Sequence, residues 1–124
     1  MNNPLDGTYL VTSTTNYEGP LEKKSDGVTE IRDGMTKRYD DYNCLWTSHF
    51  KILSDTEVEM VSIADPKDAH IDFLLRRPDG SPTREPVTYT THLKFARKGD
   101  KIQMSGQILY GDEIVFLTLR KTGV

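Results

Sequence analysis

The three histidines are the side chains best suited to bind a metal ion. They stand at His49, His70 and His92, far apart in the sequence. Strand alternation would place His49 and His92 on polar faces, where two histidines and a carboxylate can meet across a sheet to bind zinc. The chain has no cysteine pair and no His-Glu-x-x-His motif. We therefore favour solvated surface histidines, and we expect no metal and no other cofactor.

A nucleophile for covalent catalysis is the second chemistry to consider. Cys44 is the single cysteine, and a thiol beside a histidine can act as a nucleophile. No Gly-x-Ser-x-Gly sequence supports a serine hydrolase. A lone cysteine at a strand edge is typically a small, partly buried hydrophobic residue. The sequence favours a protein that is not an enzyme, and the enzymatic alternative is a metal-dependent site near His49 and His92.

A short acidic stretch could bind a cation. Asp40 and Asp41, with Asn43, offer the oxygen ligands that calcium takes. They lack the spaced, glycine-interrupted pattern of a calcium-binding loop. We interpret the stretch as a solvated turn between two strands.

An arginine- and proline-rich stretch lies before the longest alternating segment. The guanidinium groups of Arg76, Arg77 and Arg84 suit phosphate and carboxylate recognition, and functional contacts concentrate on loops held by a rigid scaffold. The alternative is a hairpin connection stiffened by proline, with arginines that balance nearby acids. We predict that these arginines, with Asp40 and Asp41, form a partner-binding loop.

Strands must position all of these residues. The chain has 14 Thr, 7 Val, 7 Ile and 11 aromatic residues against 3 Ala, which is typical of a β-protein. Asp-Gly or Gly-Asp pairs, which suit tight hairpin turns, occur at 6–7, 26–27, 33–34, 79–80, 99–100 and 111–112. Strands are expected at 8–15, 28–32, 35–40, 44–53, 57–63, 71–76, 87–95, 102–108 and 114–121.

This pattern predicts an all-β fold without a second domain. Eight or nine antiparallel strands in sequential order, apolar on one face, indicate an up-and-down meander over residues 1–124 that forms a barrel or a curled sandwich. The strongest helix signal is at Asp65-Pro66, which could begin a helical turn of at most a turn or two.

The alternation defines an inner face. Its apolar members are predicted to be Trp46, Phe50, Tyr89, Phe95 and Met104, with Ile108 beyond them. They could line a ligand cavity, but eight-stranded barrels are narrow enough for such side chains to fill the core, and we favour that interpretation. Between 57 and 63 the apolar residues change phase, which predicts a β-bulge in that strand.

The last predicted strand is apolar on both faces. Ile114 and Phe116 lie on one side, and Val115, Leu117 and Leu119 on the other. The strand is either central and covered on both sides, or its outer face pairs with another subunit. We favour a homodimer.

Composition excludes several classes of function. The 28% charged and 35% hydrophobic residues are typical of a globular protein rather than a disordered or membrane-spanning one. The net charge of −3 argues against non-specific binding to nucleic acid. The start of the chain has no basic stretch and no apolar run of the kind that marks a secretory signal. With a single cysteine, the cytoplasm is the expected compartment.

The two ends of the chain resemble lipocalins and related calycins. Gly7-Thr8-Tyr9 is similar to the Gly-x-Trp that opens the first strand of that family, with Tyr in place of Trp. Arg120 or Lys121 stands where the family carries a basic side chain packed over the aromatic ring, which closes the barrel between first and last strands. The resemblance implies a small β-barrel with an interior cavity.

A second resemblance is to small lipocalin-like negative regulators of bacterial type III secretion. They also open with Asp-Gly-x-Tyr, here Asp6-Gly7-Thr8-Tyr9, and carry an exposed acidic stretch that contacts a partner protein. The nearest such stretch here is Tyr39-Asp40-Asp41-Tyr42, which is shorter and less acidic. We expect a binding or regulatory module that acts through protein–protein contacts; the alternative is a carrier of a small apolar ligand inside the barrel.

Overall fold

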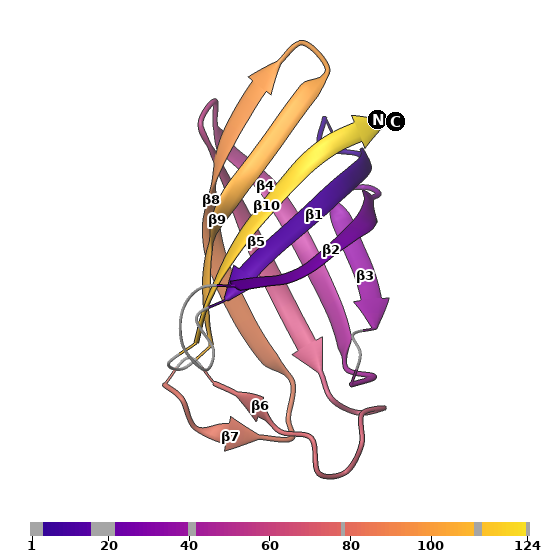
Figure 1. Cartoon of the computed structure of the whole chain (residues 1–124), viewed down its shortest axis with the longest axis vertical. Coiled ribbons are helices and arrows are strands. Elements are labelled where there is room, and N and C mark those ends of the chain that lie inside the picture. The colour runs from indigo at the N-terminus through magenta and orange to yellow at the C-terminus, as the bar shows by residue number, and fades with distance from the viewer. Residues whose placement is uncertain (1–3, 16–21, 40–41, 78, 111–112, 124) are drawn as a thin grey trace.

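In the computed structural model of the protein, the chain forms a nearly closed antiparallel β-barrel with a small two-stranded ribbon at one end (Figure 1). The structure describes residues 4–15, 22–39, 42–77, 79–110 and 113–123, and these include no helix. The strands are β1 (Gly7–Thr15), β2 (Glu22–Ile31), β3 (Met35–Tyr39), β4 (Leu45–Ser54), β5 (Glu57–Asp65), β6 (Leu75–Arg76), β7 (Pro82–Thr83), β8 (Val87–Lys98), β9 (Lys101–Tyr110) and β10 (Glu113–Gly123).

The barrel wall confirms the predicted meander. Its eight strands follow the order β2-β1-β10-β9-β8-β5-β4-β3, while β6 and β7 pair only with each other. The first strand β1 pairs with the last strand β10, from Thr8 opposite Gly123 to Thr15 opposite Val115. This pairing closes the wall at the position that the resemblance to lipocalins implied. The gap in the wall therefore lies between β2 and β3, at the two ends of the strand order.

The gap begins directly beyond the turn between β2 and β3. Asp33 (φ 53°) and Gly34 (φ 73°) are both left-handed, as a two-residue hairpin turn requires. Arg32 and Met35 exchange backbone hydrogen bonds of 3.0 Å, and pairing then stops among the described residues. Both oxygens of the Asp6 carboxylate accept hydrogen bonds, at 2.9 Å, from the N–H groups of Asp33 and Gly34. The predicted turn is confirmed, and the N-terminal segment holds it while the strands diverge.

Alternating side chains fill the inside of the barrel. In β8 the inner residues run from Val87 to Phe95 at every second position, as predicted, and all of them are buried. Tyr9, Leu93 and Met104, from three different strands, have no exposed surface. Burial of such apolar surface is the main source of stability in a domain of this size.

The predicted bulge in the strand at 57–63 is wrong. The inner positions of β5 are Val58, Met60, Ser62 and Ala64 in unbroken alternation, and all four are buried. The small side chains of Ser62 and Ala64 occupy the inner positions, so the larger Val61 and Ile63 face outward. The register shift lies instead in β4, between Ile52 and Ser54.

Two local predictions need correction, and a third is made more precise. The stretch 71–76 is not a strand, because only Leu75 and Arg76 pair with another segment. The pair at 26–27 is not a turn, since both residues lie inside β2 and pair with β1. The expected helical turn at 65–70 is a single hydrogen-bonded turn, in which Ala69 N–H donates to the Pro66 carbonyl and Lys67 N–H to the Asp65 carboxylate, each at 3.0 Å.

Candidate functional site

The connection between β5 and β8 crosses the lower end of the barrel (Figure 1). We call residues 66–77 and 79–86 the lid segment; it contains β6 and β7. Four of its residues are buried and anchor it to the core: Pro66, Ala69, Leu75 and Thr83. The Tyr89 hydroxyl donates a hydrogen bond from the barrel wall to the Arg76 carbonyl, and burial, with Cys44 nearby, raises the pKa of Tyr89 to about 12. The lid segment is thus part of the folded core.

The three arginines of the predicted binding loop hold the lid segment together. The Arg76 guanidinium donates to the Gly80 carbonyl at 2.9 Å, and Arg77 donates to the Thr83 hydroxyl at 3.0 Å. Arg84 donates to the carbonyls of His70 and Phe73, at 2.8 and 3.0 Å. All three side chains stay exposed at the surface. Their internal bonds fix where each guanidinium lies, and the exposed faces remain open to contact.

The loop after β3 joins the lid segment. Tyr39 donates its hydroxyl hydrogen to the Asp68 carboxylate at 3.3 Å, and the negative charge of Asp68 is the main reason why the pKa of Tyr39 is raised. The Asn43 side-chain amide donates to the Asp68 carbonyl at 3.0 Å. The rings of Tyr42 and Phe73 stack with centroids 5.3 Å apart. Two stretches that are distant in sequence thus form one surface.

Asp40 and Asp41, the other two residues of the predicted binding loop, lie outside the described residues. The residues on either side of them are described, and both Tyr39 and Tyr42 contact the lid segment. Asn43, the third residue of the candidate cation site, has a left-handed backbone with φ 65°. Its side-chain amide is already used in a hydrogen bond to the Asp68 carbonyl.

Exposed apolar side chains concentrate on this end of the barrel. The exposed fractions are 52% for Tyr39, 64% for Tyr42, 78% for Ile71 and 52% for Leu74. We call these four residues the lid surface. Sequence reasoning missed it, because the alternation of Ile71, Phe73 and Leu75 was assigned to a strand. The Pro66 turn and the Arg-Pro stretch on either side were the available signal that this segment is a loop.

The five predicted cavity residues all point into the barrel. Phe50, Tyr89, Phe95 and Met104 are buried, and Trp46 is partly buried against the same core. The rings of Trp46 and Tyr89 stack with centroids 5.7 Å apart. These side chains are therefore part of the packed core.

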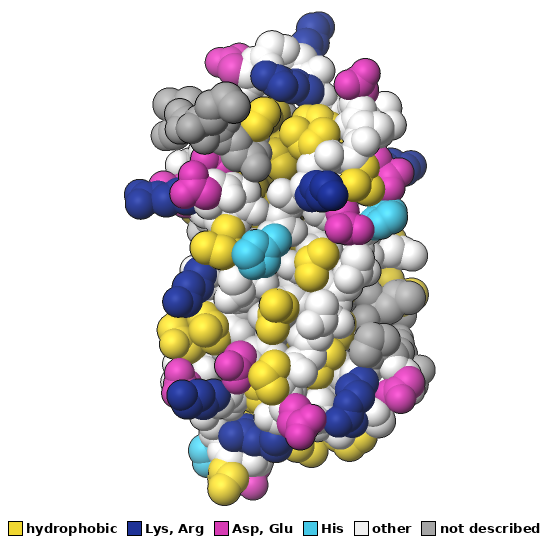
Figure 2. Space-filling model, turned by 180° about the vertical axis from the view of Figure 1, so that it is seen from behind, with side chains coloured by type: hydrophobic (Ala, Val, Ile, Leu, Met, Phe, Trp, Pro, Cys, Tyr) yellow, Lys and Arg dark blue, Asp and Glu magenta, His cyan; other side chains and the backbone are white. Residues whose placement is uncertain are grey.

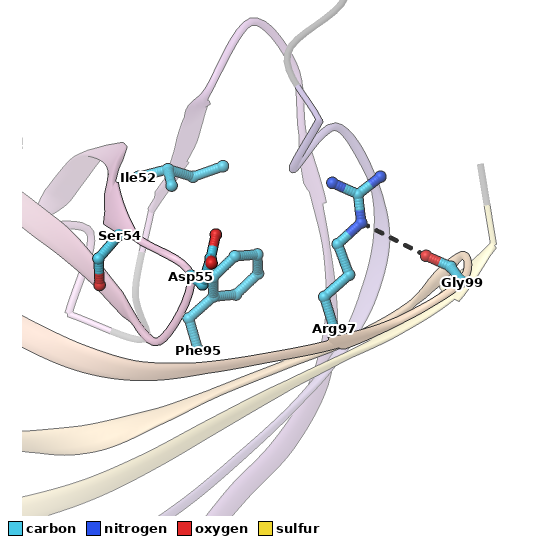
Figure 3. A pocket seen from close by; sticks show the side chains of 6 residues that line it. All are labelled: Ile52, Ser54, Asp55, Phe95, Arg97 and Gly99. Carbon is cyan, nitrogen blue, oxygen red and sulfur yellow. Dashed lines mark hydrogen bonds between the residues drawn. The ribbon is translucent and has the colours of Figure 1, made fainter.

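One hollow of about 530 Å³ opens at the upper end of the barrel. Phe95 and Ile52 form its apolar part, and Asp55 from the β4–β5 turn and Arg97 from β8 approach it (Figure 3). The Arg97 Nε donates to the Gly99 carbonyl at 3.4 Å. Because its lining carries charges of both signs, this hollow does not select for an anion or a cation by charge alone.

His49 and His92 lie on outer faces, as alternation predicted. His49 on β4 stands opposite Val61, while His92 on β8 stands opposite Glu59, so the two are in different rows of the sheet. The His92 ring nitrogens lie 2.7 Å from Glu57 and 3.5 Å from Glu59. Within the described part of the chain no group of three potential ligands is arranged to hold a metal.

Cys44 and the last strand complete the predicted features. Cys44 is fully buried and forms no disulfide.

Both edges of β10 are paired, with β1 and β9, so β10 cannot add a strand from another subunit. Its outer face carries Phe116, 40% exposed, and the partly buried Ile114. A homodimer through this outer face remains a prediction.

The fold defines the protein as an all-β, nearly closed, eight-stranded antiparallel barrel. Comparisons with models of protein families, with curated proteins and with solved structures found no match to the chain. Among the residues that the structure describes, no helix is long and apolar enough to cross a membrane.

Proposed function

We propose that the protein is a non-enzymatic binding module that contacts another protein through the lid surface. The observation that carries this proposal is the concentration of exposed Tyr39, Tyr42, Ile71 and Leu74 beside three exposed arginines. Tyrosine and arginine are enriched at the centres of protein–protein interfaces, where aromatic and guanidinium groups supply most of the binding energy.

The rigidity of this surface supports the proposal. Tyr42 is held by its stacking on Phe73, and Arg84 is held by two backbone carbonyls. Side chains that are ordered before binding lose less conformational entropy when the complex forms. The middle of the barrel wall offers a contrast: on the face drawn in Figure 2, most hydrophobic side chains there are separated by polar ones, which is normal for a protein surface.

A site-specific crosslinking experiment tests the proposal. A photoreactive amino acid replaces Ile71 in one variant and Val28 on β2 in the control; the two positions are 78% and 72% exposed. In cells that express the protein, the Ile71 variant should give a discrete crosslinked partner, and Leu74→Asp in the same chain should abolish it. Identical products from both positions, or products that survive Leu74→Asp, would reject the lid surface as the contact site.

Carriage of a small apolar ligand is the second candidate function, and the upper hollow is the observation that favours it. Phe95 and Ile52 give this hollow an apolar floor. Native mass spectrometry of the freshly purified protein tests both the carrier and the dimer: a carrier shows extra mass that is lost on denaturation, and a homodimer shows twice the chain mass. A ligand-free protein would exclude the carrier function.

The cytoplasm remains the expected compartment, and this expectation rests on the single cysteine.

A further inference from the structure

A groove forms where the β8–β9 hairpin separates from β10. The β9–β10 ladder ends at Gln103 opposite Arg120, while the β8–β9 ladder continues to Lys98 opposite Lys101 and β10 continues to Gly123 beside β1. The hairpin and the end of β10 therefore part from each other at the upper end of the barrel (Figure 1). The space between them has a volume of about 410 Å³.

Five cationic side chains from three strands line this groove: Arg97, Lys98, Lys101, Arg120 and Lys121. Among the described residues no carboxylate lines it, and the buried Ile102 forms part of its base. We call it the basic groove. It was missed in the sequence because its two halves are about twenty residues apart and only the register of β9 and β10 brings them together.

The basic groove is positively charged, whereas the whole protein has a net negative charge. Residues 94–101 and 120–121 contain six Lys and Arg and one acid, Asp100. The rest of the chain contains 10 Lys and Arg against 18 Asp and Glu. Clustered like charges repel one another and destabilise the folded state, and an anion bound among them would relieve this repulsion.

The described residues provide no carboxylate partner for the cations of the groove. Within the described part of the chain, none of the five forms an ion pair. Arg97 uses Nε for the Gly99 carbonyl; its side chain lies between the basic groove and the upper hollow, and lines both (Figure 3). Lys121 is partly buried, and burial strengthens the attraction between a cation and an anion that reaches it.

We propose that the basic groove binds a compact, multiply charged phosphate compound that is free in solution. Guanidinium groups bind phosphate oxygens in pairs, and lysine ammonium groups add point charges. The groove is a small concave space between two ribbons rather than a broad face. A lipid headgroup is disfavoured, because none of the large exposed hydrophobic residues lies in the described hairpin between residues 96 and 102, and membrane-bound loops insert such side chains. The site lies at the opposite end of the barrel from the lid surface, and it does not depend on the function proposed for that surface.

The test uses inorganic tripolyphosphate as the probe and the full chain. Calorimetric titrations at about 50 mM salt, where electrostatic binding is weakly screened, compare the protein with two groove variants, Lys98→Gln/Lys101→Gln and Arg120→Gln/Lys121→Gln. The matched control, Lys51→Gln/Lys67→Gln, removes the same charge from exposed lysines elsewhere. Because the hairpin variant leaves β10 unchanged, it gives a result even if the substitutions in β10 impair folding.

The proposal expects saturable binding by the protein and a loss of about tenfold or more in affinity for each folded groove variant. The control should lose less than about threefold, because its charges act only at long range. No saturable binding, or equal losses in control and groove variants, would overturn the proposal. Sedimentation with phosphatidylcholine vesicles that contain about one third phosphatidylserine supplies the other arm: vesicle binding without tripolyphosphate binding would assign the groove to a membrane instead.

Discussion

The two ends of the barrel use arginine in opposite ways. At the lower end, Arg77 and Arg84 donate to acceptors of the lid segment and stabilise it. At the upper end, Arg97 and Arg120 line a groove in which the described residues place no carboxylate. The residue type is the same, and the difference lies in the acceptors that the fold supplies. A guanidinium that donates to several loop acceptors supports the structure, whereas Arg97 donates only through Nε, to the Gly99 carbonyl, in the described residues, and its terminal nitrogens are available to a ligand.

The largest expected effect is a loss of stability at alkaline pH, caused by two buried tyrosines, Tyr9 at the upper end of the barrel and Tyr89 at the lower end. Tyr9 donates to the Leu5 carbonyl at 2.6 Å; burial, with Asp6 nearby, raises its pKa to about 12, the value that Tyr89 also reaches. Below pH 10 both rings are neutral in the folded and the unfolded chain, and their contribution to stability is complete. Between pH 10 and 12 only the unfolded chain ionises, so the free energy of unfolding should fall by about 5 kcal/mol in total.

Urea denaturation at several pH values from 9 to 12 measures this loss. Tyr9→Phe and Tyr89→Phe should each remove about half of the alkaline loss, because phenylalanine cannot ionise. Equal halves would show that the two ends contribute alike. If either variant keeps the full pH dependence, that tyrosine does not have the raised pKa.

The anchoring of the lid segment predicts the next largest effect. Leu75→Ala should lower the free energy of unfolding by about 2–4 kcal/mol, because Leu75 is only 5% exposed. Ile71→Ala in the same segment should change it by less than about 0.5 kcal/mol, since Ile71 is 78% exposed. Guanidinium denaturation curves measure both. Equal effects would mean that the lid segment is not anchored as described.

The two hydrogen bonds that Asp6 accepts from the β2–β3 turn at the upper end, which we call the Asp6 clamp, should contribute less to the free energy of unfolding. Asp6→Ala removes the acceptor of two backbone hydrogen bonds in the β2–β3 turn, and we expect a loss of about 1–2 kcal/mol. Asp33→Asn, in the same turn, is the control: asparagine tolerates the left-handed φ of 53°, so stability should hardly change. Thermal unfolding of both variants provides the comparison. A larger effect of Asp33→Asn than of Asp6→Ala would contradict the clamp.

The smallest expected effect is a gain in stability rather than a loss. Lys98→Gln/Lys101→Gln relieves repulsion in the basic groove, so the melting temperature should rise by about 1–2 °C at low salt. Added salt should abolish the gain by screening. The same charge removal at Lys51 and Lys67, outside the groove, should not raise it. A fall in melting temperature for the groove variant would show that its lysines stabilise the fold.

Most of the barrel could be predicted from local patterns. The alternation in residues 87–95 and 102–108 predicted β8 and β9, and the Asp33-Gly34 pair predicted its turn, because both signals act over a few residues. The first half of β2 was missed. Residues 22–26 are polar, without an apolar period, and they form a strand because they pair with β1. The phase of β5 was misassigned because Ser62 and Ala64 occupy the inner positions.

The candidate sites were less predictable than the fold. The sequence pointed to Arg76, Arg77 and Arg84 as a loop, but their hydrogen bonds depend on carbonyls whose directions no pattern encodes. The lid surface needs the contact between Tyr42 and Phe73, and the basic groove needs the end of the β9–β10 ladder. Both features are tertiary contacts, which form only once the strands are in register.

The pairing of β1 with β10 also sets a condition on synthesis. Thr8 and Gly123 are direct partners, so the first strand leaves the ribosome long before its neighbour exists. Until then one edge of β1 exposes unpaired backbone groups, which invite pairing with other chains. Contacts between such distant segments also slow folding. The barrel can close only after translation has passed β10, and a nascent chain stalled earlier should depend on chaperones.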